Sequence, residues 1–226
     1  SIYPMLKANY GLTFTQVGLI TLTFQLTASL LQPWVGYHTD RHPKPWLLPA
    51  GSICTLIGIV MMSMVGSFPL ILLAAALIGI GSSTFHPEAS RIARLASGGR
   101  FGLAQSTFQV GGNAGSAFGP LLAAAIIIPF GQANVAWFGL FAVFALFVLY
   151  RISRWYAHHL NLFKLKAGQA ATHGLSKGRV ISALVVLGLL VFSKYFYMAS
   201  LTSYFTFYLI EKFDLSVASS QLHLFL

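Results

Sequence analysis

The feature that most constrains this chain is a series of apolar stretches, each long enough to cross a lipid bilayer as a helix. Crossing the hydrocarbon core takes about 20 consecutive, mostly apolar residues in an α-helix. Only 8% of the residues are charged, which is too few to cover a water-facing surface, so the sequence predicts an all-α, polytopic membrane bundle. The six stretches are residues 14–36, 46–66, 69–90, 101–130, 134–151 and 180–210.

Partial segments flank these stretches. Residues 2–8 have the pattern of the end of an earlier helix, and Val217 begins the pattern of another. We therefore expect a chain that is cut at both ends and lacks the C-terminal half of a larger carrier. The expected parts are an N-terminal bundle (1–151), a basic cytoplasmic linker (152–179) and the start of a C-terminal bundle (180–226).

The basic residues are distributed unevenly between the two sides of the predicted bundle. Of the 14 lysines and arginines, eleven lie in 41–44, 91–100 and 151–179, which the topology puts on one side. Cytoplasmic loops are enriched in Lys and Arg, so we expect this side to be cytoplasmic. Topology thus explains the net charge of +10, and we expect no nucleic-acid partner.

Polar side chains recur at helical spacing within four of the apolar stretches. Such residues are costly in lipid and usually face a cavity or another helix. They predict a water-accessible pathway for substrate and protons, with interhelical hydrogen bonding as the alternative. The candidate pathway residues are Gln25, Gln32, His86, Glu88, Gln105, Gln109, Asn113, Lys194 and Tyr197.

Three of these residues can change or carry charge. Lys194 lies roughly 22 Å into its helix, which predicts contact with an anionic ligand or an internal ion pair. His86 and Glu88 can both titrate, so either could carry a coupling proton. The alternative for Glu88 is an ion pair with Arg91 or Arg41 at the membrane edge.

A glycine repeat marks the stretch 101–130. Gly111, Gly115 and Gly119 recur every four residues and are followed by Pro120. Small residues at this spacing let helix backbones approach closely. The repeat predicts either a smooth seam between moving helices or ordinary static packing.

The segment after the first stretch reads Gly36-Tyr-His-Thr-Asp40-Arg41-His-Pro43-Lys44. It resembles the signature loop of the major facilitator superfamily, and it lies where that family has it, between the first two stretches on the basic side. The resemblance implies that Gly36, Asp40, Arg41 and Lys44 form a charge latch that holds the outward-facing state. Pro43 departs from the family pattern, which often has glycine there.

Longer stretches resemble the drug-exporting branch of the same superfamily. Gly115-x-x-x-Gly119-Pro120 partly matches its antiporter motif, and residues 85–91, 97–100, 108–113 and 193–200 are similar to one of its members. The resemblance implies a bacterial inner-membrane carrier that exports a small anionic phosphonate drug by proton antiport and alternating access.

Two other classes of protein are alternatives to a drug exporter. A carrier of the same fold for a different metabolite, sugar or drug remains open. A membrane-embedded enzyme would need a zinc motif, a nucleophile elbow or a phosphate-binding loop, and the sequence has none. We therefore expect no catalytic residues, no metal and no cofactor.

Overall fold

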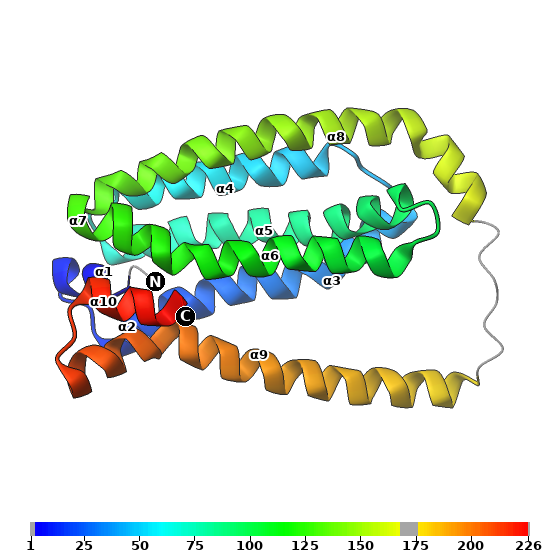
Figure 1. The fold of residues 1–226 in the computed structure, drawn as a ribbon. Coiled ribbons are helices and arrows are strands. Elements are labelled where there is room, and N and C mark those ends of the chain that lie inside the picture. The colour runs from blue at the N-terminus through cyan, green and yellow to red at the C-terminus, as the bar shows by residue number, and fades with distance from the viewer. Residues whose placement is uncertain (1–2, 168–175, 226) are drawn as a thin grey trace.

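The computed structural model describes residues 3–167 and 176–225, and all regular elements in this part are helices. The long helices run roughly side by side as an elongated bundle (Figure 1). The elements are α1 (Tyr3–Tyr10), α2 (Phe14–Gln25), η1 (Leu26–Leu30), α3 (Leu31–Arg41), α4 (Leu47–Met64), α5 (Phe68–Ala96), α6 (Phe101–Leu122), η2 (Ala123–Ile127), α7 (Ile128–Phe130), η3 (Gln132–Ala136), α8 (Trp137–Ala167), α9 (Lys177–Phe213) and α10 (Val217–Phe225).

Six helical segments of the described chain are long and apolar enough to cross a membrane. They follow the predicted order, so the prediction of an all-α membrane bundle is confirmed. The segments are Phe14–Arg41, Leu47–Met64, Phe68–Ala96, Phe101–Phe130, Gln132–Leu160 and Lys177–Leu201.

The first span is longer than predicted, because α3 continues through most of the expected link 37–45. The His42 N–H still donates to the His38 carbonyl at 2.9 Å, but His42 itself has left the helical conformation. Pro43 follows, and proline disfavours the helical conformation of the residue before it. The signature from Gly36 to Arg41 is therefore helical, and the sequence prediction of a loop there is wrong.

The helix α8 is also longer than predicted. We expected it to end at Arg151, but it runs to Ala167, since no glycine or proline interrupts it before Gly168. The first part of the expected linker 152–179 is thus helical, and residues 168–175 lie outside the described residues. The division of the chain into two bundles joined by a linker stays a prediction.

A glycine-lined contact holds α4 against α5. A Cβ added at Gly51 would lie 3.1 Å from the Gly81 carbonyl oxygen, and one added at Gly58 would lie 2.9 Å from the Ala74 carbonyl oxygen. At Gly81 the added Cβ would lie 2.5 Å from the Gly51 carbonyl oxygen. Only glycine permits backbones this close. We call Gly51, Gly58 and Gly81 the glycine seam.

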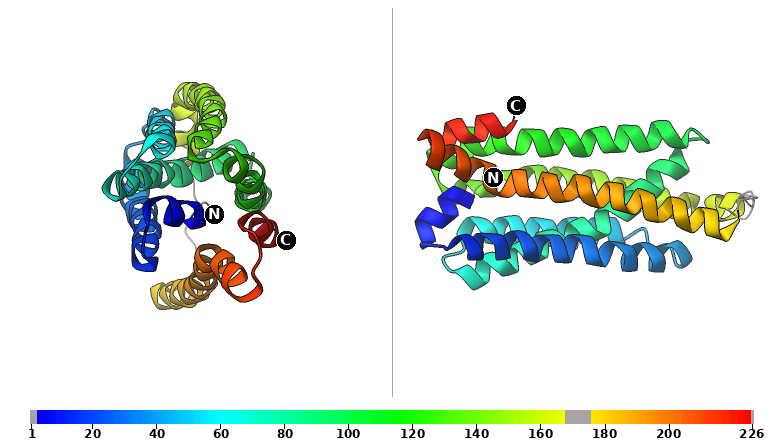
Figure 2. Two further views of the ribbon diagram at one scale, coloured as in Figure 1. Left: turned by 90° about the vertical axis from the view of Figure 1, so that its left-hand side faces the viewer. Right: turned by 90° about the horizontal axis from the view of Figure 1, so that it is seen from below.

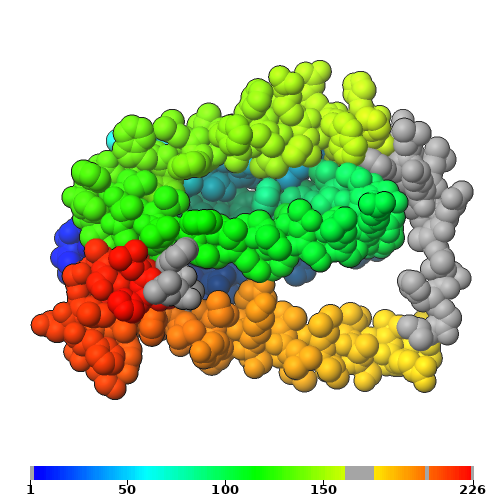
Figure 3. Space-filling model, viewed as in Figure 1, coloured from blue at the N-terminus to red at the C-terminus, as the bar shows by residue number. Residues whose placement is uncertain are grey.

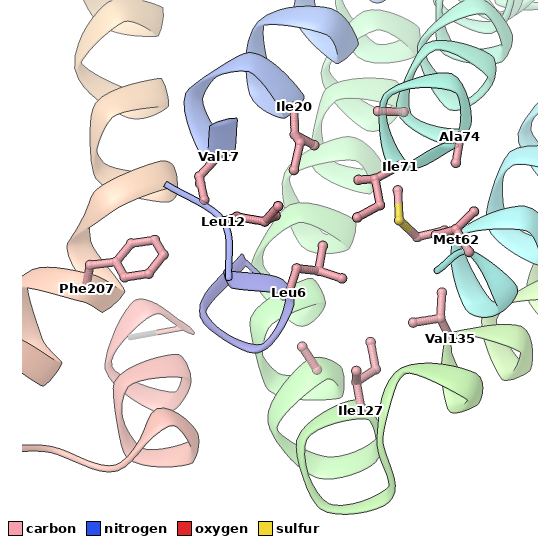
Figure 4. Close-up of a cluster of buried hydrophobic side chains, with 13 residues drawn as sticks. Leu6, Leu12, Val17, Ile20, Met62, Ile71, Ala74, Ile127, Val135 and Phe207 are labelled. Carbon is pink, nitrogen blue, oxygen red and sulfur yellow. The ribbon is translucent and has the colours of Figure 1, made fainter. Parts of the chain in front are cut away.

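The two ends of the bundle differ in chemistry. The end of α3, the α5–α6 turn and the last turns of α8 lie at one end (Figure 1), which we call the basic end because Arg41, Arg94 and Arg151 lie there. The largest buried apolar cluster lies at the opposite end. It draws on α1, α2, α4, α5, η2, η3 and α9, and Leu6, Ile20, Met62, Ile71, Val135 and Phe207 are among its members (Figure 4).

A hydrogen-bonded tie joins three elements at the opposite end. The Tyr10 hydroxyl lies 2.7 Å from both the Val65 carbonyl oxygen and the Gln132 Oε1, and the Gln132 amide donates to the Met62 carbonyl at 2.9 Å. Carbonyls in the last turn of a helix have no partner within that helix. The tie therefore satisfies the end of α4 and fixes α1 and η3 to it.

The helix α9 lies apart from the main bundle over its first half. Its second half contacts α1 and α10, and the Phe207 and Phe14 rings meet edge to face at 5.2 Å. No residue of its apolar span is buried within the chain. The end-on view separates α9 from α5 and α8 (Figure 2), and an open gap lies between its first half and α6 (Figure 3).

The close packing at the glycine seam can be tested by substituting one of its glycines. We expect Gly81→Ala to destabilise the protein by about 1–3 kcal/mol, because the new methyl group must push α4 and α5 apart. Thermal unfolding of the detergent-purified protein measures this. Gly111→Ala is the matched control, since nothing described lies within 4 Å of an added Cβ there. Equal destabilisation by both substitutions would contradict the seam.

Candidate functional site

An arginine with two carboxylates forms the most polar site in the described chain, at the basic end. The Arg91 Nη2 lies 2.6 Å from Asp40 Oδ1, and its Nη1 lies 3.0 Å from Glu88 Oε1. Arg91 also donates to the Thr39 carbonyl at 2.8 Å and to the Thr39 hydroxyl at 2.7 Å. Glu88 is fully buried, whereas the Asp40 side chain is 72% exposed. We call Asp40, Glu88, Arg91 and Thr39 the Arg91 cluster.

Local helical geometry brings the cluster together. Glu88 and Arg91 are three residues apart on α5 and so lie on one face of that helix. Thr39 and Asp40 come from the last turn of α3, and the Thr39 hydroxyl donates back to the Val35 carbonyl at 2.9 Å. A buried carboxylate needs such partners, because an unpaired charge away from water is very costly.

The helix α8 reaches the same region from the other side. Tyr156 is buried, and a side-chain hydrogen bond joins it to Arg91. One turn earlier, the Ser153 hydroxyl donates to the Pro45 carbonyl at 2.7 Å and so ties α8 to the α3–α4 connection. These contacts depend on turns of α8 that extend beyond the predicted end of that helix.

Of the four predicted latch residues, only Asp40 forms an ion pair in the described chain. Asp40 pairs with Arg91 rather than with its sequence neighbour Arg41, whose guanidinium lies over the Tyr37 ring at 3.7 Å. Gly36 lies beside Pro87, with room for a methyl group at ordinary contact distance, and its carbonyl lies 3.5 Å from Arg91 Nη2. Lys44 forms no ion pair with any described residue.

A second cluster brings together two of the predicted pathway residues, His86 and Gln105. The Ser90 hydroxyl on α5 donates to Gln105 Oε1 on α6 at 2.9 Å. The Phe108 ring meets His86 edge to face at 6.2 Å. Glu88 lies on another side of α5, buried in the Arg91 cluster, so the two titratable residues of the His-Pro-Glu segment face different surroundings.

The other predicted pathway residues are not brought together within the described chain. Gln25, Gln109, Asn113, Lys194 and Tyr197 are all exposed, and Gln32 is half-buried. Lys194 lies 5.6 Å from the centre of the Tyr195 ring, and no described carboxylate pairs with it. The helices α6 and α9, which hold four of these residues, stand apart in Figure 3. The predicted pathway therefore stays a prediction.

The polar stripe that contains Gln25 and Gln32 is interrupted by the π-helical turn η1. A π-helical turn takes one more residue than an α-helical turn, so regular spacing does not continue across it. Gly79 of α5 contacts Thr27 in this turn, and an added Cβ there would lie 2.8 Å from the carbonyl oxygen of Phe24 in the last turn of α2. The Thr27 hydroxyl bonds the Thr23 carbonyl at 2.8 Å.

The glycines of the predicted packing motif on α6 make no close backbone contact with another helix of the described chain. No atom lies within 4 Å of a Cβ added at Gly111, Gly115 or Gly119. Pro120 lies inside the helix and precedes the π-helical turn η2. The close packing occurs instead at the glycine seam, and a seam on α6 stays a prediction.

A cavity of about 330 Å³ lies between α2, α4, α5 and α8. Phe24, Phe85 and Leu149 line it together with the hydroxyls of Ser52 and Thr55, which donate to carbonyls of their own helix at 3.1 and 3.3 Å. It contains no charged side chain, so it does not suit an anionic ligand. No group of three or more metal-binding side chains occurs among the described residues.

Sequence reasoning missed the central residue of the site. Arg91 was counted only as a topology charge and as one alternative partner of Glu88. The i, i+3 spacing from Glu88 was the available signal. No sequence signal pointed to the contacts of Asp40, Tyr156 or Phe108, because these depend on how separate helices are rotated and placed.

Comparison with known proteins adds the family. The chain is 59% identical over 227 residues to the Fosmidomycin resistance protein of Escherichia coli (strain K12). It is 38% identical over 229 residues to the Uncharacterized MFS-type transporter YfnC of Bacillus subtilis (strain 168). Both alignments cover 100% of this chain but only 55% and 56% of the relatives, so the chain spans about half of their length. No solved structure matches.

The family model described as Major Facilitator Superfamily matches residues 1–226. This agrees with the signature at Gly36 to Lys44 and with the six apolar spans. One of the two relatives is named as an MFS-type transporter, and the resemblance inferred from the sequence is confirmed. The chain belongs to the Major Facilitator Superfamily.

Proposed function

We propose that this chain is part of an inner-membrane carrier that exports a small anionic phosphonate drug of the fosmidomycin type in exchange for protons. The observation behind this substrate is the 59% identity, over the whole chain, to a protein named for fosmidomycin resistance. The superfamily membership supports a carrier. In this proposal the basic end faces the cytoplasm, as the concentration of Lys and Arg at that end favours.

Lys194 is our candidate contact for the substrate. It lies about 25 Å along α9 from Lys177, deep within an apolar span. An ammonium group at this depth of a membrane-spanning helix needs an anion or another polar partner. No described carboxylate pairs with it. A phosphonate would satisfy this charge when the binding site forms, and the other pathway candidates on α6 would line the same route.

The Arg91 cluster is our candidate for the conformational latch. Asp40 and Arg91 join α3 to α5 at the basic end. The helix α8 contacts Arg91 through Tyr156 and the α3–α4 connection through the Ser153–Pro45 hydrogen bond. The latch implied by the signature is therefore proposed with Arg91, rather than Arg41, as the cation that holds Asp40. Lys44 and Gly36 stay members of the proposed latch by resemblance.

In the same proposal, proton binding by the Arg91 cluster would change the ion pairing of the latch. Two carboxylates and one guanidinium give it one excess negative charge when both carboxylates are ionised. Uptake of one proton by Glu88 would make the cluster neutral and leave Arg91 paired with Asp40 alone. His86 is the alternative proton carrier, because it lies at the exposed surface of α5 beside α6.

The buried pair can be tested by stability. We expect Arg91→Gln to destabilise the protein by about 3–5 kcal/mol, because Glu88 is left as a buried charge without its partner. The double variant Glu88→Gln with Arg91→Gln should recover part of the loss. Thermal unfolding in detergent measures both. If the double variant unfolds at a lower temperature than Arg91→Gln alone, Glu88 is not held as a charge by Arg91.

The latch can be tested by comparing two neighbouring residues. Asp40→Asn should lower drug export about fivefold if the ion pair biases two conformations by about 1 kcal/mol. Arg41→Gln is the matched control, because Arg41 contacts the Tyr37 ring and no described carboxylate. Drug uptake into inverted vesicles at equal protein levels gives the rates. A loss with Arg41→Gln but not with Asp40→Asn would contradict this latch.

The substrate is tested in a fosmidomycin-sensitive bacterium that expresses the full-length protein. We expect the unaltered protein to raise the tolerated drug concentration, Lys194→Gln to abolish this gain, and Lys212→Gln, at the far end of α9, to preserve it. If Lys194→Gln keeps the gain, Lys194 is structural and export still stands. If the unaltered protein is in the membrane and gives no gain, the drug assignment fails and a superfamily carrier for another small molecule is favoured.

A further inference from the structure

One side of α8 carries an exposed stripe that changes from apolar to basic toward the basic end. Phe144, Phe147, Arg151 and Trp155 follow at spacings of three and four residues, which places them on one side of the helix. The two phenylalanines are 68% and 55% exposed, and Trp155 is 40% exposed. The Arg151 guanidinium lies 5.0 Å from the centre of the Phe147 ring, and Arg154 is exposed beside it.

The acidic residues of the chain leave these arginines without an anion. The sequence contains four carboxylate side chains: Asp40, Glu88, Glu211 and Asp214. The first two are held by Arg91. The other two lie at the C-terminal end of α9, which is at the opposite end of the bundle from the last turns of α8 (Figure 1). Any anion that Arg151 and Arg154 bind must therefore come from outside this part of the chain.

The opposite side of these turns faces the bundle. Ser153 and Tyr156 are buried, and they bond Pro45 and Arg91. The described contacts of α8 are chiefly with α4 and η3, and α8 runs along the outside of the bundle in Figure 1. The stripe of Phe144, Phe147, Arg151 and Trp155 is thus the outer side of an outer helix.

We propose that this stripe, with Arg154, binds the headgroup of an anionic phospholipid. Arginine recognises phosphate through paired, charge-assisted hydrogen bonds, and tryptophan is enriched at the level of the headgroups. The exposed phenylalanines lie on the lipid side of Arg151, where an acyl chain would run. This lipid site is separate from the proposed drug export and does not depend on it. Its basic residues lie in the same two turns of α8 as Ser153 and Tyr156, which face the bundle.

The test measures the affinity of delipidated, detergent-purified full-length protein for dioleoylphosphatidylglycerol by native mass spectrometry. A basic residue near an anionic surface contributes about fivefold in affinity, so the double variant Arg151→Gln with Arg154→Gln should bind about 30-fold more weakly. The matched control is Arg94→Gln with Arg100→Gln, which removes the same charge from the α5–α6 turn and should bind nearly as tightly as the unaltered protein. The variant Arg151→Lys with Arg154→Lys keeps both charges but not the paired hydrogen bonds, so it should recover only part of the affinity.

Three outcomes would overturn the proposal. Equal weakening by both double variants would mean that the basic end attracts the lipid without a site on α8. Unchanged affinity of the variant Arg151→Gln with Arg154→Gln would show that these arginines form no lipid site. Circular dichroism that matches the unaltered protein shows that the variant is folded. Displacement of the lipid by millimolar inorganic phosphate, with equal affinity for dioleoylphosphatidylcholine, would indicate a site for free phosphate instead.

Discussion

The close backbone contact between α4 and α5 fixes the positions of the helices around it. Lipid offers no hydrogen bonds to exposed backbone groups and no driving force that distinguishes one apolar surface from another. Helices in this solvent are held by close packing and by polar contacts, and the glycine seam provides the first. With α4 and α5 joined at Gly51, Gly58 and Gly81, the remaining face of α5 receives α2 and α3, and α4 receives α8.

The Arg91 cluster provides the polar contact in this arrangement. A single guanidinium is shared by Glu88 from its own helix, Asp40 and Thr39 from α3, and Tyr156 from α8. Each of these helices contacts the α4–α5 pair, so the cluster can form only when the seam has set their spacing. The bundle thus has an apolar core near one end and an ionic contact near the other, with the glycine seam between them.

The sequence alone predicts the parts of this structure that depend on composition along one helix. The six spans follow from runs of apolar residues, and the family follows from the signature at Gly36 to Lys44. The sequence does not reveal contacts that depend on the rotation of one helix relative to another. Asp40 and Arg91 are 51 residues apart, and nothing in the chain distinguishes Arg91 from Arg41 as the partner of Asp40. Similarly, Gly111 and Gly115 form the more regular repeat, but the glycines in contact are Gly51 and Gly81.

The π-helical turn at Leu26–Leu30 has a consequence for the alignment of the first span. One residue more or less in a helix turns everything beyond it by about 100° around the axis. The extra residue of this turn therefore sets the direction in which Thr39 and Asp40 face, although it lies more than two helical turns away from them. The number of residues in this segment, more than the identity of its side chains, sets how the second half of the span is rotated about the helix axis relative to the first half. A chain that lost a single residue there would keep its hydrophobicity and its signature, yet would turn the signature away from α5.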